Sequence, residues 1–417
     1  MAEELPVIRP PLATPDQVHI ESRAIALLAR TDVQGICRRA AQHWIDALSP
    51  NPEHRSCFEA EFEQAAFCGL MNAVNADPTR PRIHAFGRFA HNLGGHSVPA
   101  TKSGHPNPDY IYRFMALEGG ARYILRGRVS GQMPTAVEIG MLTAEQFYQH
   151  NISRRALVIA ADGHFTITID PDPAGGRANH FRSTPETRQL LMRDVIGDLS
   201  QQRPLEIWVE SVEPASAALP DSDDAIAASC EVHIRKHIDD LIWVYNQLII
   251  KASPNHFETP AIHKSGVYGV SQASCAVNFD LAEENAFVIT LGLGNAAYAV
   301  VPVSNYWGGV GRSLDRQVTL GTGRARPDPD GRYTFVVSHS DPGVPNWVDP
   351  AGLHQGVLFL RWVGFDPADQ RLPTLDARHL DLRQVDALLA EGTPRLSAAD
   401  RQAQLARRRR DYLGVMS

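Results

Sequence analysis

The chain has 417 residues, of which 43% are hydrophobic and 21% charged, and its net charge is −7. This balance is typical of a globular protein with a sizeable apolar core, and the acidic charge argues against nucleic acid as the main partner. No apolar run reaches the ~18 residues that a membrane-spanning helix needs, so we expect no membrane insertion.

The cysteines and the N-terminus indicate the compartment. The five cysteines are odd in number, widely spaced and contain no CxxC pair. This pattern favours reduced thiols over disulfides or a zinc site. The N-terminus is acidic and rich in proline, without the apolar segment of a signal peptide. We therefore expect a cytoplasmic protein.

Residues 1–81 are predicted to be a helical region. Thr14-Pro15-Asp16-Gln17 and Thr31-Asp32-Val33-Gln34 both have the S/T-x-x-Q form of a capping box, which predicts two helix starts. The prolines of residues 49–52 should end the second helix, and residues 57–74 should form a third. We expect these helices to pack on a β-rich body.

Residues 82–215 are predicted to be a first β unit, with strands at 110–115, 121–129, 135–139, 188–196 and 205–212. Residues 82–110, rich in glycine, proline and histidine, have no sustained periodicity and predict a long functional loop. A capping box at Ser183-Thr184-Pro185-Glu186 would make residues 188–196 a helix. The internal repeat described below favours a strand there.

The second half of the chain is predicted to repeat this plan. A linking region, 216–260, holds an amphipathic helix over 221–253. A second β unit, 261–372, resumes at Val267, and a tail, 373–417, is predicted to be helical from Asp376 onward. Ser397 should cap its last helix, which ends RRRRDYLGVMS, and four consecutive arginines near a helix C-terminus suit the helix dipole. A nucleic-acid or lipid contact is the less favoured interpretation of these arginines.

An internal repeat is the main organising feature. Asp162-Gly163 and Asp330-Gly331 each open a similar run, in which an Asn and then an Arg follow. The Asn residues are Asn179 and Asn346, and the Arg residues are Arg193 and Arg361. The Asp-Gly pairs and the arginines are 168 residues apart, and residues 121–127 align with 286–292 at an offset of 165. Such co-linearity predicts an ancestral duplication, with Asp162 and Asp330 as partners of Arg193 and Arg361.

The residues around the second Asp-Gly pair resemble a bacterial family known mainly as a domain of unknown function. Its DPDG, DPGxxNW and LxxRW motifs match Asp328–Gly331, Asp341–Trp347 and Leu358–Trp362. Asn107-Pro108-Asp109 with Tyr112 and Arg113 resembles the family's motif at the start of its first sheet, and Asn305-Tyr306-Trp307 another of its motifs. The resemblance implies β-sandwich architecture and no particular reaction. Family members often lie among lipid, steroid or terpenoid degradation genes.

These observations predict the fold class. We expect an α+β, mainly β protein of two pseudo-repeated antiparallel β-sandwich units of jelly-roll type. A helical region should precede them, a long helix should link them, and helices should follow them.

The candidate chemistry lies mainly in the second unit. His339, Asp341, Asn346 and His354 cluster around a Pro-Gly turn, and a His with a nearby carboxylate predicts an acid/base pair. The alternative is that Asp341-Pro342-Gly343 is only a turn in which Asp341 accepts backbone N–H bonds. Residues 305–315 form a polar-aromatic loop suited to closing over a ligand, or else a glycine-rich crossover pinned by one buried Trp.

The histidines of residues 82–110 are the candidates for a metal site. The spacings of His84, His91, His96 and His105 match no ordered zinc pattern. Walker, Rossmann, Gly-x-Ser-x-Gly and catalytic-cysteine signatures are absent from the sequence. We therefore expect neither a metal nor a cofactor.

The leading functional hypothesis is a cofactor-independent lyase, hydratase or isomerase acting on a small, largely apolar alcohol or carbonyl compound. Its pocket should lie between the β body and residues 82–110. His339 is predicted to be the acid/base group, with Asp341 or Asp315 as its carboxylate partner. The predicted ligand contacts are Tyr112, Arg113, Asn305, Tyr306, Trp307 and Asn346.

Two other hypotheses stay open. One is a non-enzymatic carbohydrate- or lipid-binding sandwich. The other is a scaffold whose arginine-rich tail binds a partner. The expected partner is a small molecule and neither nucleic acid nor a membrane, and homo-oligomer formation is left open.

Overall fold

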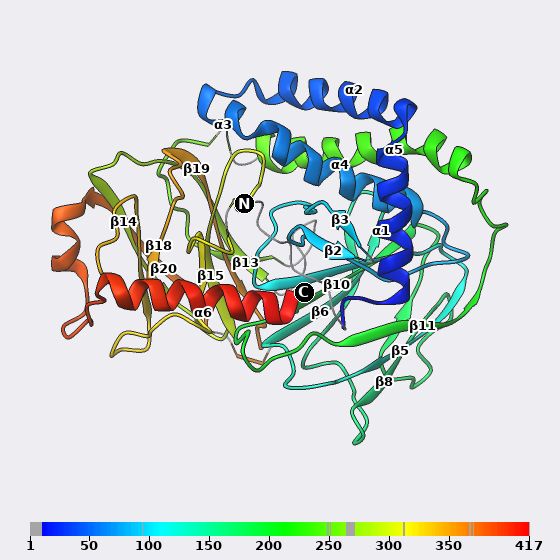
Figure 1. The fold of residues 1–417 in the computed structure, drawn as a ribbon. Helices are drawn as coiled ribbons and strands as arrows, with labels where there is room; N and C mark the ends of the chain where they lie inside the picture. Colours follow the sequence, from blue (N-terminus) through cyan, green and yellow to red (C-terminus); the bar gives the residue numbers. More distant parts are fainter. Residues whose placement is uncertain are drawn as a thin grey trace.

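The structure is a computed structural model, and it describes residues 11–93, 95–247, 250, 252–263, 272–311, 313–366, 368–369 and 371–416. Two β-rich bodies lie side by side, and helices cover one side of both (Figure 1). The predicted start of the second unit at Val267 lies outside the described residues. Among the described residues, no helix combines the length and hydropathy that crossing a bilayer requires.

The N-terminal region is helical, as predicted. Its helices are α1 (Pro15–Leu28), α2 (Thr31–Leu48), α3 (Pro52–Ser56) and α4 (Phe58–Val74). Thr14 caps α1, since its hydroxyl accepts a hydrogen bond from Gln17 N over 3.1 Å. The second predicted cap was wrong: Thr31 is already helical, and Arg30 precedes it without a side-chain cap bond. The short α3 was not predicted.

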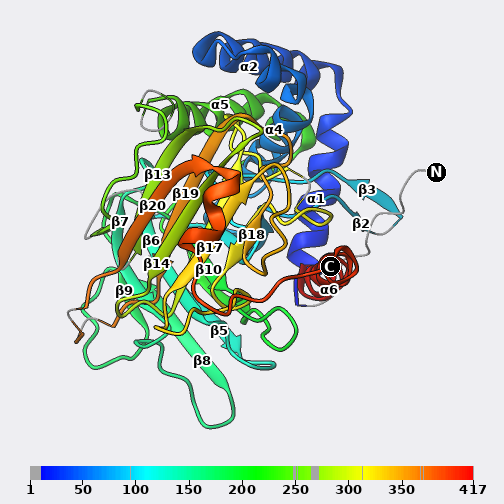
Figure 2. The ribbon, with the colours of Figure 1, turned by 90° about the vertical axis from the view of Figure 1, so that its left-hand side faces the viewer.

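These helices pack on the sheets together with α5 (Asp223–Leu241), as Figures 1 and 2 show. The linking helix is shorter than predicted, because a π-helical turn, η1 (Ile242–Gln247), follows Leu241. Gly69 of α4 allows close contact with α5: a Cβ there would lie 2.9 Å from the Ile234 Cα. The helical layer therefore shares one apolar core with both β units and is no separate bundle.

The first β unit consists of two sheets, ordered β1-β4-β10-β6-β7 and β11-β5-β8-β9. Its strands are β1 (His84–Phe86), β4 (Tyr110–Ala116), β5 (Arg122–Arg128), β6 (Ala136–Thr143), β7 (Tyr148–Ser153), β8 (His164–Asp170), β9 (His180–Arg182), β10 (Thr187–Val195) and β11 (Glu206–Glu213). Residues 188–196 are mainly strand, as the repeat predicted. The apolar inner faces of the two sheets enclose one core.

The second β unit has sheets ordered β12-β13-β19-β15-β16 and β20-β14-β17-β18. Its strands are β12 (Ala261–His263), β13 (Gln272–Asp280), β14 (Asn285–Gly292), β15 (Tyr298–Ser304), β16 (Thr319–Gly321), β17 (Tyr333–Ser338), β18 (Trp347–Val348), β19 (Gln355–Val363) and β20 (Thr374–Asp381). The tail was predicted to be helical from Asp376, but residues 376–381 belong to β20, which pairs with β14.

The two units have the same topology. Each has a five-stranded sheet and a four-stranded sheet in equivalent order, and each four-stranded sheet ends in a short parallel strand, β9 or β18. The strands β10 and β19 start 168 residues apart and have nine residues each. Together with a structural neighbour described below, this order supports the predicted repeated sandwich-like fold.

One alignment within the repeat was shifted by a residue. Leu125 pairs with Ile167, and Ile289 pairs with Phe335. Since Ile167 and Phe335 are 168 apart, Leu125 corresponds to Ile289, at an offset of 164. The predicted offset of 165 would equate Leu125 with Thr290, whose side chain points to the opposite face of its sheet.

The two units meet through their five-stranded sheets. Side chains from both form a shared cluster that includes Tyr110, Val195, Tyr298 and Val363. Backbones approach so closely that a Cβ on Gly323 would lie 2.3 Å from the Gly197 carbonyl oxygen. The units are therefore packed tightly against each other.

The chain ends in α6 (Ala398–Met416), which runs along the second unit (Figure 1). Ser397 and Asp400 cap its start as predicted: Asp400 N donates to Ser397 Oγ over 3.2 Å, and Ser397 N to Asp400 Oδ2 over 3.0 Å. A 3-10 helix, η2 (Leu382–Leu388), and the segment after it connect β20 to α6.

Residues 82–110 are more ordered than the predicted long loop. They contain β1 and the hairpin β2 (His91–Leu93) and β3 (His96–Val98). Lys102, which is 1% exposed, donates to Glu61 over 2.8 Å and to the Trp307 carbonyl oxygen over 2.9 Å. This segment is therefore built into the interface between the helical layer and the sheets.

Candidate functional site

His339 lies directly after β17, with a side chain only 5% exposed. Its Nε2 is 3.1 Å from the carbonyl oxygen of Leu281. A carbonyl oxygen only accepts hydrogen bonds, so Nε2 must carry the proton. In the neutral ring, Nδ1 is then the nitrogen with a free lone pair.

Two other side chains stand beside His339 Nδ1. Glu283 lies in the turn between β13 and β14, and its Oε1 is 3.8 Å from His339 Nδ1. His354 precedes β19, and its Nε2 is 3.3 Å from the same Glu283 oxygen. The centroids of the two imidazole rings are 4.8 Å apart, and the ring planes make an angle of 33°. We call Glu283, His339 and His354 the His-Glu cluster.

The helical layer supplies a fourth group. Glu53 of α3 accepts a hydrogen bond from His354 N over 3.1 Å, and its other oxygen is 3.4 Å from His354 Nδ1. Asn51 holds α3 in this position, since its side chain caps the helix and also donates to Gln355 over 2.8 Å. Four separate stretches of the chain therefore converge on this point.

The cluster faces solvent on one side, because the side chains of Glu283 and His354 are 64% and 49% exposed while that of His339 is 5% exposed. Within the described ranges, it is the one group of three His, Cys, Asp or Glu side chains whose ligand atoms all lie within 4.8 Å. Such a set can exchange a proton with a small molecule or hold a cation.

Only the second unit carries this cluster. At the offset of 168, His339 and His354 correspond to Pro171 and Glu186 of the first unit. A residue that the shared fold requires is expected in both copies, whereas these histidines occur in one. The comparison of the two copies therefore distinguishes the histidines of the cluster from residues that both copies need for the shared fold.

The predicted carboxylate partners of His339 lie elsewhere, and the structure pairs His339 with Glu283 instead. Asp341 accepts from Gly343 N over 2.8 Å, as in the turn interpretation, and from Arg401 Nε over 2.8 Å. Asp315 forms an ion pair with Arg409 of α6. Both carboxylates thus fasten α6 to the second unit.

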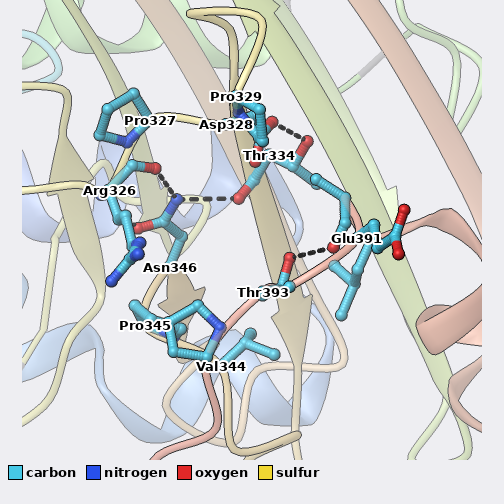
Figure 3. A pocket seen from close by; sticks show the side chains of 14 residues that line it. Arg326, Pro327, Asp328, Pro329, Thr334, Val344, Pro345, Asn346, Glu391 and Thr393 are labelled. Carbon is cyan, nitrogen blue, oxygen red and sulfur yellow. Dashed lines mark hydrogen bonds between the residues drawn. The ribbon is translucent and has the colours of Figure 1, made fainter.

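Asn346 has a backbone role that both units repeat. Its side chain donates to the carbonyl oxygens of Arg326 and Thr334 over 2.8 and 3.0 Å and accepts from Arg326 N over 2.8 Å (Figure 3). In the first unit, the Asn179 side chain likewise accepts a hydrogen bond from Val158 N and donates one to the Val158 carbonyl oxygen. Because the two bonds with Arg326 recur with Val158 at the equivalent position of the first unit, the fold accounts for this role of Asn346.

The polar-aromatic loop anchors the helical layer. Asn305 accepts from Trp307 N and Gly309 N and donates to Glu61 over 2.8 Å. Tyr306 stacks on His54 with ring centroids 3.9 Å apart. Trp307 is fully buried, so of the two interpretations of this loop the glycine-rich crossover held by one buried Trp is the one that fits. Arg312 of the same loop lies outside the described residues.

Tyr112 and Arg113 are buried in the first unit. The Tyr112 hydroxyl accepts from Asn107 N over 3.1 Å, and Arg113 forms an ion pair with Asp194. Neither side chain lies in the His-Glu cluster, so the structure divides the predicted site residues among several places.

The predicted pairing of the repeated arginines with Asp162 and Asp330 was wrong. Both aspartates lie in hairpin turns, beside His164 and Arg332. Arg193 and Arg361 point between the units, where Arg193 donates to Gln272 over 3.3 Å and Arg361 to the His105 carbonyl oxygen over 2.6 Å. Near Arg193, burial raises the pKa of Glu138 to about 7.

Two hollows occupy equivalent places on the outer sheets. In the second unit, the segment 389–394 lies against Arg326, Thr334 and Asn346 and encloses a cavity of about 210 Å³ (Figure 3). In the first unit, Val158, Thr166 and Asn179 line a larger hollow of about 640 Å³, together with Trp208. Neither hollow lies at the predicted pocket beside residues 82–110.

Comparison with known proteins supports the fold. No protein-family model and no curated protein matches the sequence. A solved structure of an uncharacterised protein from Burkholderia cenocepacia has a TM-score of 0.69 at 21% identity, covering 86% of this chain and 99% of that chain. The VPA0106 protein from Vibrio parahaemolyticus has a TM-score of 0.41 at 11% identity, covering 66% of this chain and 90% of that chain.

Fold and site together define a duplicated β-sandwich protein with a covering helical layer and one His-Glu cluster. The likeness to the Burkholderia structure concerns the fold alone. The resemblance to a bacterial family of unknown function stays a prediction.

Sequence reasoning found part of the cluster. His339 and His354 lie within 16 residues of each other in the sequence, whereas Glu283 lies more than 50 residues before them in a short acidic turn, so sequence proximity does not indicate it. The useful signal was the repeat itself: alignment of the two copies marks positions 339 and 354 as histidines in one copy only.

Proposed function

We propose that the protein is an enzyme that transfers protons to or from a small, largely apolar alcohol or carbonyl compound. The reaction is of lyase, hydratase or isomerase type, and the His-Glu cluster is its proton-transferring centre. The observation that carries this proposal is the arrangement of His339. Leu281 fixes its tautomer, and its free lone pair faces Glu283 beside a solvent-accessible histidine.

Each group has a chemical task in this proposal. The buried ring of His339 is held rigidly, which keeps the centre in one geometry. Exposed His354 is the group that substrate reaches first, and Glu283 stabilises positive charge that develops on either ring. Glu53 orients His354 from behind.

Replacing His339 by Gln is expected to lower the rate of proton transfer by roughly 10²–10⁴-fold, since positioned acid–base groups contribute about that much. Deuterium incorporation next to the carbonyl of a panel of ketones in D₂O, followed by NMR, measures this rate without knowledge of the product. His354→Gln should give a similar loss.

The matched control is His164→Gln, because His164 is also a histidine near a carboxylate but lies in the first unit's hairpin. It should exchange at the wild-type rate. Equal losses in H164Q and H339Q, or exchange by wild type at the uncatalysed rate across the panel, would contradict the proposed function.

A second candidate function, carbohydrate binding, is favoured by one observation on the first unit. Trp208 is 42% exposed at the open hollow, next to the Arg126–Glu210 ion pair at 2.8 Å. In the second unit, η2 and the segment after it cover the corresponding sheet face. An exposed indole beside charged groups suits stacking and hydrogen bonding to a sugar.

Under this second candidate, neutral malto- or cello-oligosaccharides should raise the melting temperature of the wild type by a few degrees, as ligand binding to the native state requires. Trp208→Ala should abolish the shift. Trp243→Ala is the control, since Trp243 is similarly exposed at 47% but lies in η1. A shift that survives W208A would exclude this hollow as the sugar site.

A further inference from the structure

We infer that the His-Glu cluster is a binding site for a divalent first-row transition metal ion such as Zn²⁺, Co²⁺ or Fe²⁺. The ligands are His339 Nδ1, His354 Nε2 and Glu283 Oε1. The inference rests on the proposed function for its catalytic meaning, although metal binding itself is measured without turnover.

Two of the three ligand-atom separations are near those that such an ion requires, and all three atoms lie within 4.8 Å of one another. Metal–ligand bonds of ~2.0–2.1 Å in tetrahedral geometry place ligand atoms roughly 3.3–3.4 Å apart. Glu283 Oε1 is 3.3 Å from His354 Nε2 and 3.8 Å from His339 Nδ1. The exposed Glu283 side chain has the freedom to adjust the longer separation.

The groups behind the two imidazoles favour the tautomers in which His339 Nδ1 and His354 Nε2 keep a lone pair beside Glu283. The Leu281 carbonyl oxygen accepts from His339 Nε2, and Glu53 lies 3.4 Å from His354 Nδ1. Metal-ligating histidines usually bond a carbonyl or carboxylate through their other nitrogen in this way. Two lone pairs and a carboxylate then face one another, and only a cation, whether a metal ion or a proton on a ring, makes this arrangement favourable.

The ligand types indicate which metals suit the site. Two imidazoles with one carboxylate favour zinc, iron, cobalt or nickel over magnesium and calcium, which prefer oxygen ligands. Since Glu283 and His354 are largely exposed, a fourth position stays open to water or substrate. With an ion bound, the two imidazoles would be ligands and would no longer exchange protons themselves. Water at the fourth position would then transfer the proton in their place, because a bound divalent metal lowers the pKa of water.

The test is titration of the chelator-treated full-length protein with Co²⁺, followed by visible absorption and by calorimetry. One equivalent should bind and give the visible bands of four- or five-coordinate cobalt. His354→Ala and Glu283→Gln should each weaken binding at least 100-fold. Glu53→Gln should weaken it by roughly 10–100-fold, the usual loss for a supporting group.

His164→Ala is the control, since it removes a surface histidine near a single carboxylate, and it should bind Co²⁺ like wild type. Both altered ligands, His354 and Glu283, are exposed, so these variants should fold. Binding that H354A and E283Q leave unchanged, or the absence of a one-equivalent transition in wild type, would overturn the inference.

The two proposals fail in different ways. Proton transfer that continues after chelation, in a protein that binds no equivalent of Co²⁺ at His354 and Glu283, would support the proposed function and overturn the metal site. One-equivalent Co²⁺ binding that depends on His354, without exchange by any metal-loaded sample, would support the metal site and contradict the proposed function.

Discussion

Replacing Asp109 by Ala is expected to lower the free energy of unfolding by about 3–5 kcal/mol, because it leaves Arg324, whose side chain is 17% exposed, without its buried counter-charge. Asp109 is fully buried and accepts hydrogen bonds from Arg324, Tyr298 and Tyr412. These groups come from the first unit, the second unit and α6. The substitution should therefore loosen all three from one another, which chemical denaturation measures.

The acid dependence of stability gives an independent readout. Burial raises the pKa of Asp109, but Arg324 and the two hydroxyls lower it by more, so the net shift is downward. A lowered pKa stabilises the fold above the ordinary aspartate pKa of 3.8, and the contribution disappears as the pH falls through the folded-state value. D109A should lack this part of the acid dependence.

Asp330→Ala is the matched control, because Asp330 forms an exposed ion pair with Arg332 at 2.8 Å in a hairpin turn. Such surface pairs contribute about 0–1 kcal/mol. If D109A cost no more than D330A, the buried network would not be what joins the two units to α6.

Replacing Trp307 by Ala is expected to cost about 3–5 kcal/mol, the usual range for a buried tryptophan. Its ring lies 5.1 Å from that of Trp44 and 4.7 Å from that of Phe58, and its Nε1 donates to the His54 carbonyl oxygen over 2.6 Å. The loss should appear in the denaturation midpoint. Trp307→Phe should recover part of it, since an aromatic ring still fills the site.

Trp208→Ala serves as the control for this prediction, since Trp208 is a partly exposed residue of the same type. It should change stability by no more than about 0.5 kcal/mol, as surface substitutions usually do. Equal effects of W307A and W208A would mean that the helical layer is held by other contacts than the Trp307 anchor.

The arginine run 407–410 shows how a tertiary partner decides the role of a charge run. It lies within α6, which continues to Met416 and has no basic residue in its last turn, so these arginines do not lie at the helix C-terminus. Arg408 is buried and donates to the carbonyl oxygens of Ser313 and Thr319, each over 2.9 Å. Arg409 forms its ion pair with Asp315. At least these two arginines fasten the helix to the second unit, which favours a structural role for them.

Much of the fold was predictable because it depends on local patterns that occur twice. Residues 188–196 show this best: a local capping box favoured a helix, and only the alignment with β19 indicated a strand. The same alignment failed by one residue at β5 and β14. Both faces of β14 carry similar apolar residues, so the sequence does not show which face points into the sandwich core. The pairing of β14 with β17 decides it.

The site was less predictable. Asp341 and Asp315 are close to His339 in sequence, yet α6, some 60 or more residues later, takes both as ion-pair partners. Glu283 reaches His339 only because β14 and β17 are neighbours in one sheet. Sequence proximity is thus a weak guide to contacts that a sheet creates.

By itself, the sequence determined the duplication, the order of helical and β regions and most strand positions. Periodicity, caps and turns depend on a few neighbouring residues and can therefore be recognised in the sequence. The tertiary structure alone decided which carboxylate faces His339, which arginines are buried and where α6 lies. Those outcomes depend on which distant segments share a sheet edge or a packed face, and no local pattern encodes that choice.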